Sequence, residues 1–562
     1  MNETLAKALE DSLSNDLRAF LPELVLCGAI VFMLLVRLIP RYDRLHLGWI
    51  ALIIAGGACF MSCEQWAAQT PQESDLARVI PTVNLFGGML VFDSFSIFLK
   101  IFLYSFITLV ILLTLLTGIP DKEDSADFYC LLFGSTIGMS IMASSNHLLM
   151  VFIGIEMASL PSYALAGFLK GRRQSSEAAL KYVVYVSGAS GVMLYGISLL
   201  AGFFDTGYLP TILAGVGAGH NLTNPVVILG LTFLLAGIGF KLASVPFHFW
   251  CPDVFEGASA EVGAFLSVAS KGAALALLAR IALGLAGLSA IRENFEVWDR
   301  ATDYLVPILS VFAVVTTTFG NLAAYGQTNL KRLLAYSTIA HAGFMMMGLA
   351  TVTRSGAGAV QFYLITYLFM NLGAFAVVAF MRNLTGHEDL SYFRGFVYRS
   401  PLLVIMLAVF LLSLLGMPPL AGFTAKFQIF RVLFDAGQEY ERLGKPHLKW
   451  TMYAVLLAGG LNTVLSLFYY VKVLKVMILE RTLEEVENRP IEQKPLPIVQ
   501  SVYISVLALA VLVLGIIWNP LAVAFSEKGQ GVDTFRAAPE RLSDTRTKAP
   551  TLGTKMPKGK DQ

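Results

Sequence analysis

Apolar runs of about 18 or more residues recur along most of this chain of 562 residues, which is 56% hydrophobic and 14% charged. Runs of that length can cross a bilayer as helices, and lipid offers an open backbone no other way to satisfy its hydrogen bonds. The sequence therefore predicts an all-α polytopic membrane protein with about fourteen transmembrane helices. The predicted spans lie at 20–38, 47–63, 93–117, 128–144, 147–168, 179–204, 226–249, 258–286, 304–325, 332–352, 357–382, 400–434, 451–478 and 499–525.

Lysine and arginine gather in alternate connections between these spans, for example at Arg37 and at Arg172 and Arg173. The stretch 205–225 on the opposite side contains neither residue type. Under the positive-inside rule the basic connections face the cytoplasm, so both termini are expected outside it, in a multi-pass protein of a bacterial cell (inner) membrane. The first 18 residues lack a signal-peptide pattern and predict a retained surface helix, whereas the polar tail 526–562 predicts disorder.

Two of the spans contain helix-breaking residues. The seventh includes Gly239 and Pro246, and the twelfth is interrupted by Gly416, Pro418 and Pro419. Interrupted spans at corresponding places of two halves are typical of inverted-repeat transporters, with the transport site at the breaks. We therefore predict two inverted five-helix repeats with broken helices 7 and 12. The predicted parts are helices 1–3 (1–127), a first half with helices 4–8 (128–286), a second half with helices 9–13 (304–478), a last helix (499–525) and the tail (526–562).

Three lysines lie inside or beside the spans near these breaks. Lys241 and Lys271 each have about ten or more mostly apolar residues on either side, and Lys426 follows the double proline by about seven residues. A charged residue near the centre of a bilayer costs roughly 2.5–3.5 kcal/mol on insertion scales. Snorkelling of the side chain to the interface is the alternative, and it fits Lys426 better than the other two. We therefore expect the lysines to have a function.

Other ionisable residues accompany the lysines. Glu156 lies well inside the fifth span, where an isolated carboxylate would take up a proton, so a partner such as Lys241 is expected. The pair either moves during function, which we favour, or forms a static structural ion pair. His248 and His341 are candidates for a proton relay, and a hydrogen-bonded core histidine is the equal alternative for each.

Two further groups have structural interpretations. The run Ser-Gly-Ala-Ser-Gly at 187–191 predicts a close helix-packing surface. Asp253 and Glu256 follow the seventh span and are expected to cap or tether the eighth helix.

The sequence shows no ligand set for a cofactor or a metal. Its five cysteines form no CxxC pair and no His/Cys cluster, and no glycine-rich turn follows a strand pattern. We therefore predict no bound cofactor, no metal site and no nucleic-acid partner, and the electrons of any coupled redox reaction would travel elsewhere.

Several motifs resemble one family in combination. They are VPFHFWCPDVFEG, AFLSVASK, QTNLKRLLAYSTIAHAGF, GIEMASLPSYAL, SSEAALKYVV and LLGMPPLAGFTAKF. Together they closely resemble subunit N (subunit 2) of proton-pumping NADH:quinone oxidoreductase, respiratory complex I, over roughly residues 90–480. More broadly, the chain resembles the Mrp-type cation/proton antiporter superfamily. The PDVFEG motif and Lys426 favour subunit N over the other two antiporter-like subunits of that complex.

This resemblance implies roles for particular residues. It makes Glu156 and Lys241 a coupled ion pair, Lys271 the central relay and Lys426 the connection to the exit side. It also implies a translocase subunit without a redox centre, since NADH, FMN, iron–sulfur clusters and a quinone would bind other subunits. The implied partners are other membrane and peripheral subunits, including other antiporter-like subunits, and the lipid bilayer. One departure is Glu261, which lies where the family usually has a proline-containing stretch.

The resulting hypothesis is proton movement coupled to quinone reduction elsewhere in a complex. Desolvation favours proton release from a buried lysine and a nearby carboxylate opposes it, so movement of Glu156 relative to Lys241 would switch proton release on and off. Two alternatives stay open: a subunit of a multi-subunit Na⁺/H⁺ antiporter, and an inactive membrane scaffold in which lysine substitutions are silent.

Overall fold

The computed structural model describes residues 13–39, 46–69, 82–121, 123–217, 223–286, 295–482, 485, 490 and 493–520. Residues 13–19 form a short helix that meets the first long helix at an angle of 77°. The rest of the predicted surface helix and the whole tail 526–562 lie outside the described residues.

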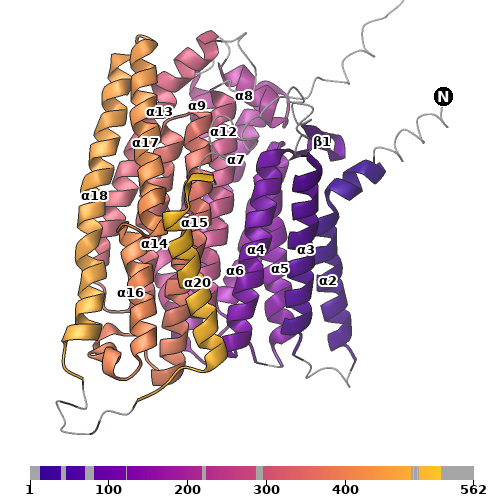
Figure 1. Ribbon diagram of the computed structural model, residues 1–562. Coiled ribbons are helices and arrows are strands. Elements are labelled where there is room, and N and C mark those ends of the chain that lie inside the picture. Colours follow the sequence, from indigo (N-terminus) through magenta and orange to yellow (C-terminus); the bar gives the residue numbers. More distant parts are fainter. Residues whose placement is uncertain are drawn as a thin grey trace, which may run out of the picture.

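The described chain is a bundle of helices that run side by side along one direction, from α2 at one edge to α18 at the other (Figure 1). A single antiparallel hairpin, β1 (Val83–Leu85) with β2 (Leu90–Phe92), precedes α4. The helices are α2 (Leu21–Arg37), α3 (Gly48–Gln69), α4 (Ser94–Thr117), α5 (Ser125–Ser144), α6 (Leu148–Ala166), α7 (Arg173–Phe204), α8 (Leu209–Gly217), α9 (Pro225–Leu242), α10 (Trp250–Gly257), α11 (Ala260–Phe265), α12 (Lys271–Leu285), α13 (Phe295–Ala324), α14 (Leu330–Ala350), α15 (Arg354–Thr385), α16 (Pro401–Leu415), α17 (Ala421–Arg442), α18 (Pro446–Leu479) and α20 (Ile498–Ile516).

The predicted polytopic helical fold is confirmed. Each of the fourteen predicted spans coincides with a helix or a pair of helices. Among the described residues, twelve helices are long and apolar enough to cross a membrane, and α2 with its bent neighbour brings the number to 13. The remaining predicted span is the twelfth, which is divided into α16 and α17 at the predicted break.

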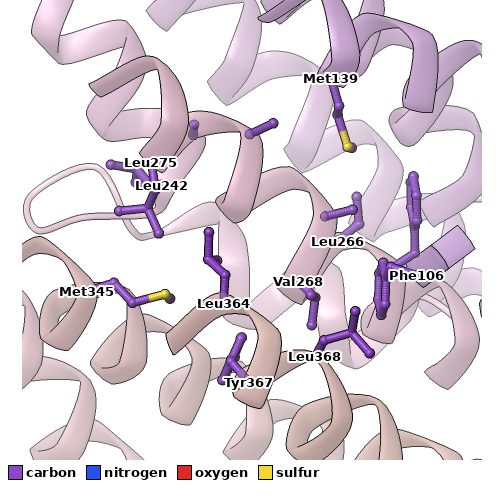
Figure 2. Close-up of a cluster of buried hydrophobic side chains, with 14 of the residues drawn as sticks. Phe106, Met139, Leu242, Leu266, Val268, Leu275, Met345, Leu364, Tyr367 and Leu368 are labelled. Atoms are coloured by element: carbon purple, nitrogen blue, oxygen red, sulfur yellow. The ribbon is translucent and has the colours of Figure 1, made fainter. Parts of the chain in front are cut away.

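Burial divides the helices into a central and an outer set. The span Ala260–Leu285 is fully buried, and α14 and α15 are nearly so. Apolar side chains such as Leu266, Leu364 and Leu368 fill the space around it (Figure 2). The outer helices instead expose large apolar side chains, for example Ile53 on α3 and Val311 on α13. In water such a surface would promote association, whereas in a bilayer it is the surface that contacts lipid.

Glycines bring two helix pairs into close contact. A Cβ atom at Gly138 of α5 would lie 2.3 Å from the backbone nitrogen of Ala158 on α6. A Cβ atom at Gly320 of α13 would likewise lie 2.6 Å from the backbone nitrogen of Ala340 on α14. Both members of the second contact lie 182 residues after their counterparts in the first. The same helix–helix contact therefore occurs once in each predicted half.

Both predicted helix breaks are present. Helix α9 ends at Leu242, and Ala243 takes a left-handed conformation (φ 55°) before the chain passes Pro246 and begins α10. Helix α16 ends at Leu415, and Gly416 (φ 93°) makes the corresponding turn before α17. A left-handed residue costs least at glycine, so the first break is the more constrained of the two. Each break leaves backbone groups inside the membrane region without helical partners, as transport sites require.

The eighth span contains a feature that the sequence did not indicate. A π-helical turn at Leu266–Ser270 separates α11 from α12, and Lys271 is the first residue after it. Such turns hold one extra residue and occur frequently at functional sites.

The glycine contact generates a stability prediction. We expect Gly138→Ala to lower the stability of the folded protein by roughly 1–3 kcal/mol, because the new methyl group overlaps the α6 backbone and the helices must separate. The measurement is the melting temperature of the detergent-solubilised protein in its complex. Gly188→Ala on α7 is the control, since a Cβ atom there meets nothing within 4 Å. Equal melting temperatures for the two variants would contradict the packing described.

Candidate functional site

Lys241 lies in the last turn of α9, directly before the first helix break. Its side chain is buried, and its Nζ atom donates a hydrogen bond of 2.9 Å to Oγ of Ser159 on α6. A positive charge is favourable here because the carbonyl groups at a helix C-terminus carry partial negative charge. The break thus holds the ammonium group in the interior without a charged partner in direct contact.

Glu156 lies one turn before Ser159 on α6, so the two side chains share one face of that helix. Its carboxylate accepts a short hydrogen bond from Oγ of Ser190 on α7. Among the described ion pairs within 4.0 Å, none joins Glu156 to Lys241, although the carboxylate still acts on the lysine electrostatically. The predicted partners are therefore neighbours that are held apart, each by a serine.

Lys271 is the next lysine along the fold. It is 1% exposed, and its Nζ atom lies 4.0 Å from Sγ of Cys251 on α10. The described ion pairs include no carboxylate partner for it. The second half of the broken seventh span thus supplies a polarisable thiol to the lysine of the eighth span.

Lys426 lies in α17 and reaches back across the second break. Its Nζ atom donates a hydrogen bond of 2.8 Å to the carbonyl of Leu415, the last residue of α16, and lies 4.6 Å from the centre of the Phe344 ring. A helix C-terminus and an aromatic face both stabilise a cation. Because the side chain is buried and bound to an internal carbonyl, snorkelling to the interface does not account for Lys426.

His341 connects the two halves of the site. Its Nδ1 atom lies 2.7 Å from the hydroxyl of Tyr363, and its Nε2 atom lies 3.3 Å from the hydroxyl of Tyr470. The charged groups that act on it are Lys271 and Lys426. A buried imidazole with a hydroxyl on each nitrogen can accept a proton on one side and release it on the other.

His248 lies apart from this arrangement. Its ring packs between Phe249 and Phe319, with ring centres 4.3 Å away in both cases. Its buried Nδ1 atom has no hydrogen-bond partner in the described part of the chain. The structure brings His341 together with the lysines and does not bring His248 to them.

Asp253 and Glu256 have partners other than those expected. Arg332 of α14 binds Asp253 at 2.8 Å and Glu256 at 2.5 Å, and Lys181 of α7 binds Asp253 at 2.9 Å. The expected tether to the eighth helix is therefore wrong, because the side chain of Ser259 caps that helix instead. The charged residues line a pocket of about 240 Å³ at one end of the bundle.

The pKa of Asp253 decides whether this pocket titrates near neutrality. Burial opposes its charge, but the hydrogen bond from Lys181 and the charge of Arg332 outweigh burial and lower the pKa of Asp253 below its ordinary value. The ion pairs are then complete above pH of about 4 and are lost only as the pH falls further. Any change in activity between pH 6 and 8 must come from other groups.

Several contributors could not be predicted from the sequence. The run 187–191 does not form the predicted close packing surface, because a Cβ atom at Gly188 or Gly191 would meet nothing within 4 Å, and Ser190 instead binds Glu156. Ser159 and Cys251 resemble ordinary packing residues. Hydroxyls in helices usually bond to their own backbone, as Thr317 does here, so nothing in the sequence distinguishes the functional ones.

The geometry agrees with comparisons to known proteins. The model of the family described as "NADH:quinone oxidoreductase/Mrp antiporter, TM" matches residues 145–440. NADH-quinone oxidoreductase subunit N of Anaeromyxobacter sp. (strain Fw109-5) is 38% identical over 513 residues, which are 89% of this chain and 94% of that protein. A chain of respiratory complex I from Thermus thermophilus with bound aureothin has a TM-score of 0.68 at 28% identity, covering 90% of this chain and 99% of that one.

A more distant structure shares the fold. A chain of the Mrp complex from Dietzia sp. DQ12-45-1b has a TM-score of 0.73 at 17% identity, covering 93% of this chain and all of that one. The fold and the buried lysines define an antiporter-like membrane subunit. The chain belongs to the NADH:quinone oxidoreductase/Mrp antiporter family. In the described residues, no group of three or more His, Cys, Asp or Glu side chains could hold a metal ion.

The contact between Ser190 and Glu156 generates a prediction. Removal of the hydroxyl in Ser190→Ala takes away a hydrogen bond to a charged group, worth about 1.5–3 kcal/mol, and frees the carboxylate to approach Lys241. We expect slower proton pumping per NADH oxidised in membrane vesicles, because the closer carboxylate stabilises the charged lysine.

The matched control is Ser187→Ala, which removes an exposed hydroxyl one turn earlier on α7. Pumping should be unchanged in this variant. Equal effects of the two substitutions would contradict the role given to Ser190.

Proposed function

We propose that this chain is the proton-translocating subunit N of a bacterial NADH:quinone oxidoreductase, and that Glu156, Lys241, Lys271 and Lys426 carry the proton. The observation that carries the proposal is the set of three buried lysines without a carboxylate in contact. Buried charges that only stabilise a fold are paired, because an unpaired charge is costly to desolvate. Lysines held by a serine, a thiol and a carbonyl can instead change their protonation state.

The first step takes place at Glu156 and Lys241. Burial favours the neutral amine of Lys241, whereas approach of the Glu156 carboxylate favours its charged form. The structure corresponds to the separated arrangement, in which Ser190 holds Glu156 and Ser159 holds Lys241. Return of Glu156 to Lys241 loads the lysine with a proton, and its departure toward α7 releases that proton to the interior.

The following steps pass through the centre of the bundle. Lys271 accepts the proton, and His341 with Tyr363 joins it to Lys426. Lys426 then delivers the proton through the second helix break at Leu415 and Gly416. His248 is a proposed relay residue of lower rank, because it packs on phenylalanine rings away from the lysines.

The proposal includes the organisation of the chain and its surroundings. Residues 128–286 and 304–478 form the two transport halves, supported by the glycine contact that recurs at the same separation in each. Helices 1–3 (1–127) and the last helix (499–525) flank them, the protein lies in the bacterial inner membrane, and both termini face away from the cytoplasm. Neighbouring membrane and peripheral subunits supply the force that moves Glu156, while NADH, FMN, iron–sulfur clusters and a quinone bind to those subunits.

The relay makes a direct prediction. We expect Lys241→Ala, Lys271→Ala and Glu156→Ala to suppress proton pumping while the complex still assembles, because each removes a group that holds the proton. The measurement is proton uptake by membrane vesicles per NADH oxidised, with assembly checked on native gels. Lys475→Ala, on α18 outside the proposed path, is the control and should pump normally.

Two outcomes would contradict the function. Normal pumping in Lys271→Ala would exclude the relay and favour the inactive scaffold. Proton uptake that requires sodium and persists in membranes without NADH:quinone activity would favour a Na⁺/H⁺ antiporter subunit.

A further inference from the structure

The span that carries Lys271 is fixed at one end by a buried ion pair. Glu261 in the first turn of α11 is fully buried, and both of its oxygens accept hydrogen bonds from Arg382, at 3.1 and 3.4 Å. Arg382 lies in the last turn of α15. A carboxylate at a helix N-terminus and a cation at a helix C-terminus each complement the helix dipole. The pair therefore ties the start of α11 to the end of α15 in one geometry.

A second buried pair fixes the other end of the same span. Arg280 of α12 donates to both oxygens of Asp93, at 2.9 and 3.1 Å. Its Nε atom also donates to the carbonyl of Ala143, near the end of α5, at 3.0 Å. Asp93 is itself the N-cap of α4, where it accepts from the backbone nitrogen of Ser96. A bidentate arginine–carboxylate pair fixes orientation as well as distance, so the rotation of α12 is set by α4 and α5.

Lys271 lies between the two pairs, ten residues after Glu261 and nine before Arg280. The π-helical turn at Leu266–Ser270 directly precedes it. A π-helical turn holds one more residue than an α-helical turn of the same rise. Its loss would rotate one part of the span relative to the other by roughly 100° and shift it by ~1.5 Å. Lys271 would then no longer point at Cys251, so the rotational register at this turn decides where the lysine points.

We propose that the Glu261–Arg382 and Asp93–Arg280 pairs are positioning residues, which fix the two ends of this span one residue out of α-helical register and so trap the π-helical turn that aims Lys271. This inference rests on the proposed relay role of Lys271. It also gives a reason for burying four charges, since buried ion pairs contribute little net stability over apolar residues of similar size. The pairs supply orientation, which apolar packing specifies less strictly.

The test uses the whole complex and keeps the two charges balanced. Glu261→Gln with Arg382→Gln removes both charges without leaving either one buried alone. We expect this double variant to assemble and to oxidise NADH, but to lose proton pumping per NADH oxidised. The exchanged variant, Glu261→Arg with Arg382→Glu, restores the pair in reverse and should recover most of the pumping.

The control is a buried ion pair of the same kind outside the Lys271 span. Lys100 of α4 contacts Glu23 of α2 at 2.8 Å, and both side chains are buried. The variant Glu23→Gln with Lys100→Met should keep the wild-type pumping ratio. An unchanged ratio in the Glu261/Arg382 double variant, or an equal loss in the control, would overturn the inference.

A structural measurement separates this inference from the proposed function. A cryo-electron microscopy map of the complex with the Glu261→Gln/Arg382→Gln variant should show the turn before Lys271 as α-helical and the lysine turned away from Cys251. An unchanged turn would refute the inference even if pumping were lost. A changed turn together with normal pumping in Lys271→Ala would refute the relay and leave the positioning role intact.

Discussion

The free-energy cost of burying a charged amine governs this structure. Lys241, Lys271 and Lys426 are each almost fully buried, and none has a carboxylate in contact among the described ion pairs. A permanently charged lysine in such a place would be costly, so the neutral and charged forms must be close in free energy. Small movements of a nearby charge are then sufficient to shift a proton. The remainder of the architecture places these amines and controls what approaches them.

The helix breaks and the π-helical turn serve this arrangement. Each interruption lies next to a lysine: the Ala243 turn follows Lys241, the π-helical turn precedes Lys271, and the Gly416 turn faces Lys426. Interrupted helices provide carbonyl groups and dipole ends that stabilise a cation without cancelling its charge. By contrast, the bidentate pairs at Glu261 and Asp93 are permanent and lie away from the lysines, at the ends of the Lys271 span. Mobile and fixed charges are thus separated along one buried helix.

The sequence predicted the helical spans and both broken helices, because apolar length and glycine or proline breaks are local properties of a chain. It also identified Lys241, Lys271 and Lys426 through their insertion cost. It could not show that Ser190 holds Glu156 away from Lys241, or that Asp253 binds Arg332, because these contacts join distant segments. The π-helical turn was equally inaccessible, since a run such as Leu266–Ser270 is compatible with an ordinary α-helix.

The central claim is that a single path joins the buried lysines of both halves, and its last member offers the most direct test. Lys426→Met keeps most of the side-chain volume beside Phe344 but removes the ionisable group. The measurement is the number of protons moved per electron in proteoliposomes that contain the purified complex. The account predicts a lower ratio than in the wild-type complex, with electron transfer still detectable. An unchanged ratio would contradict a path that ends at Lys426.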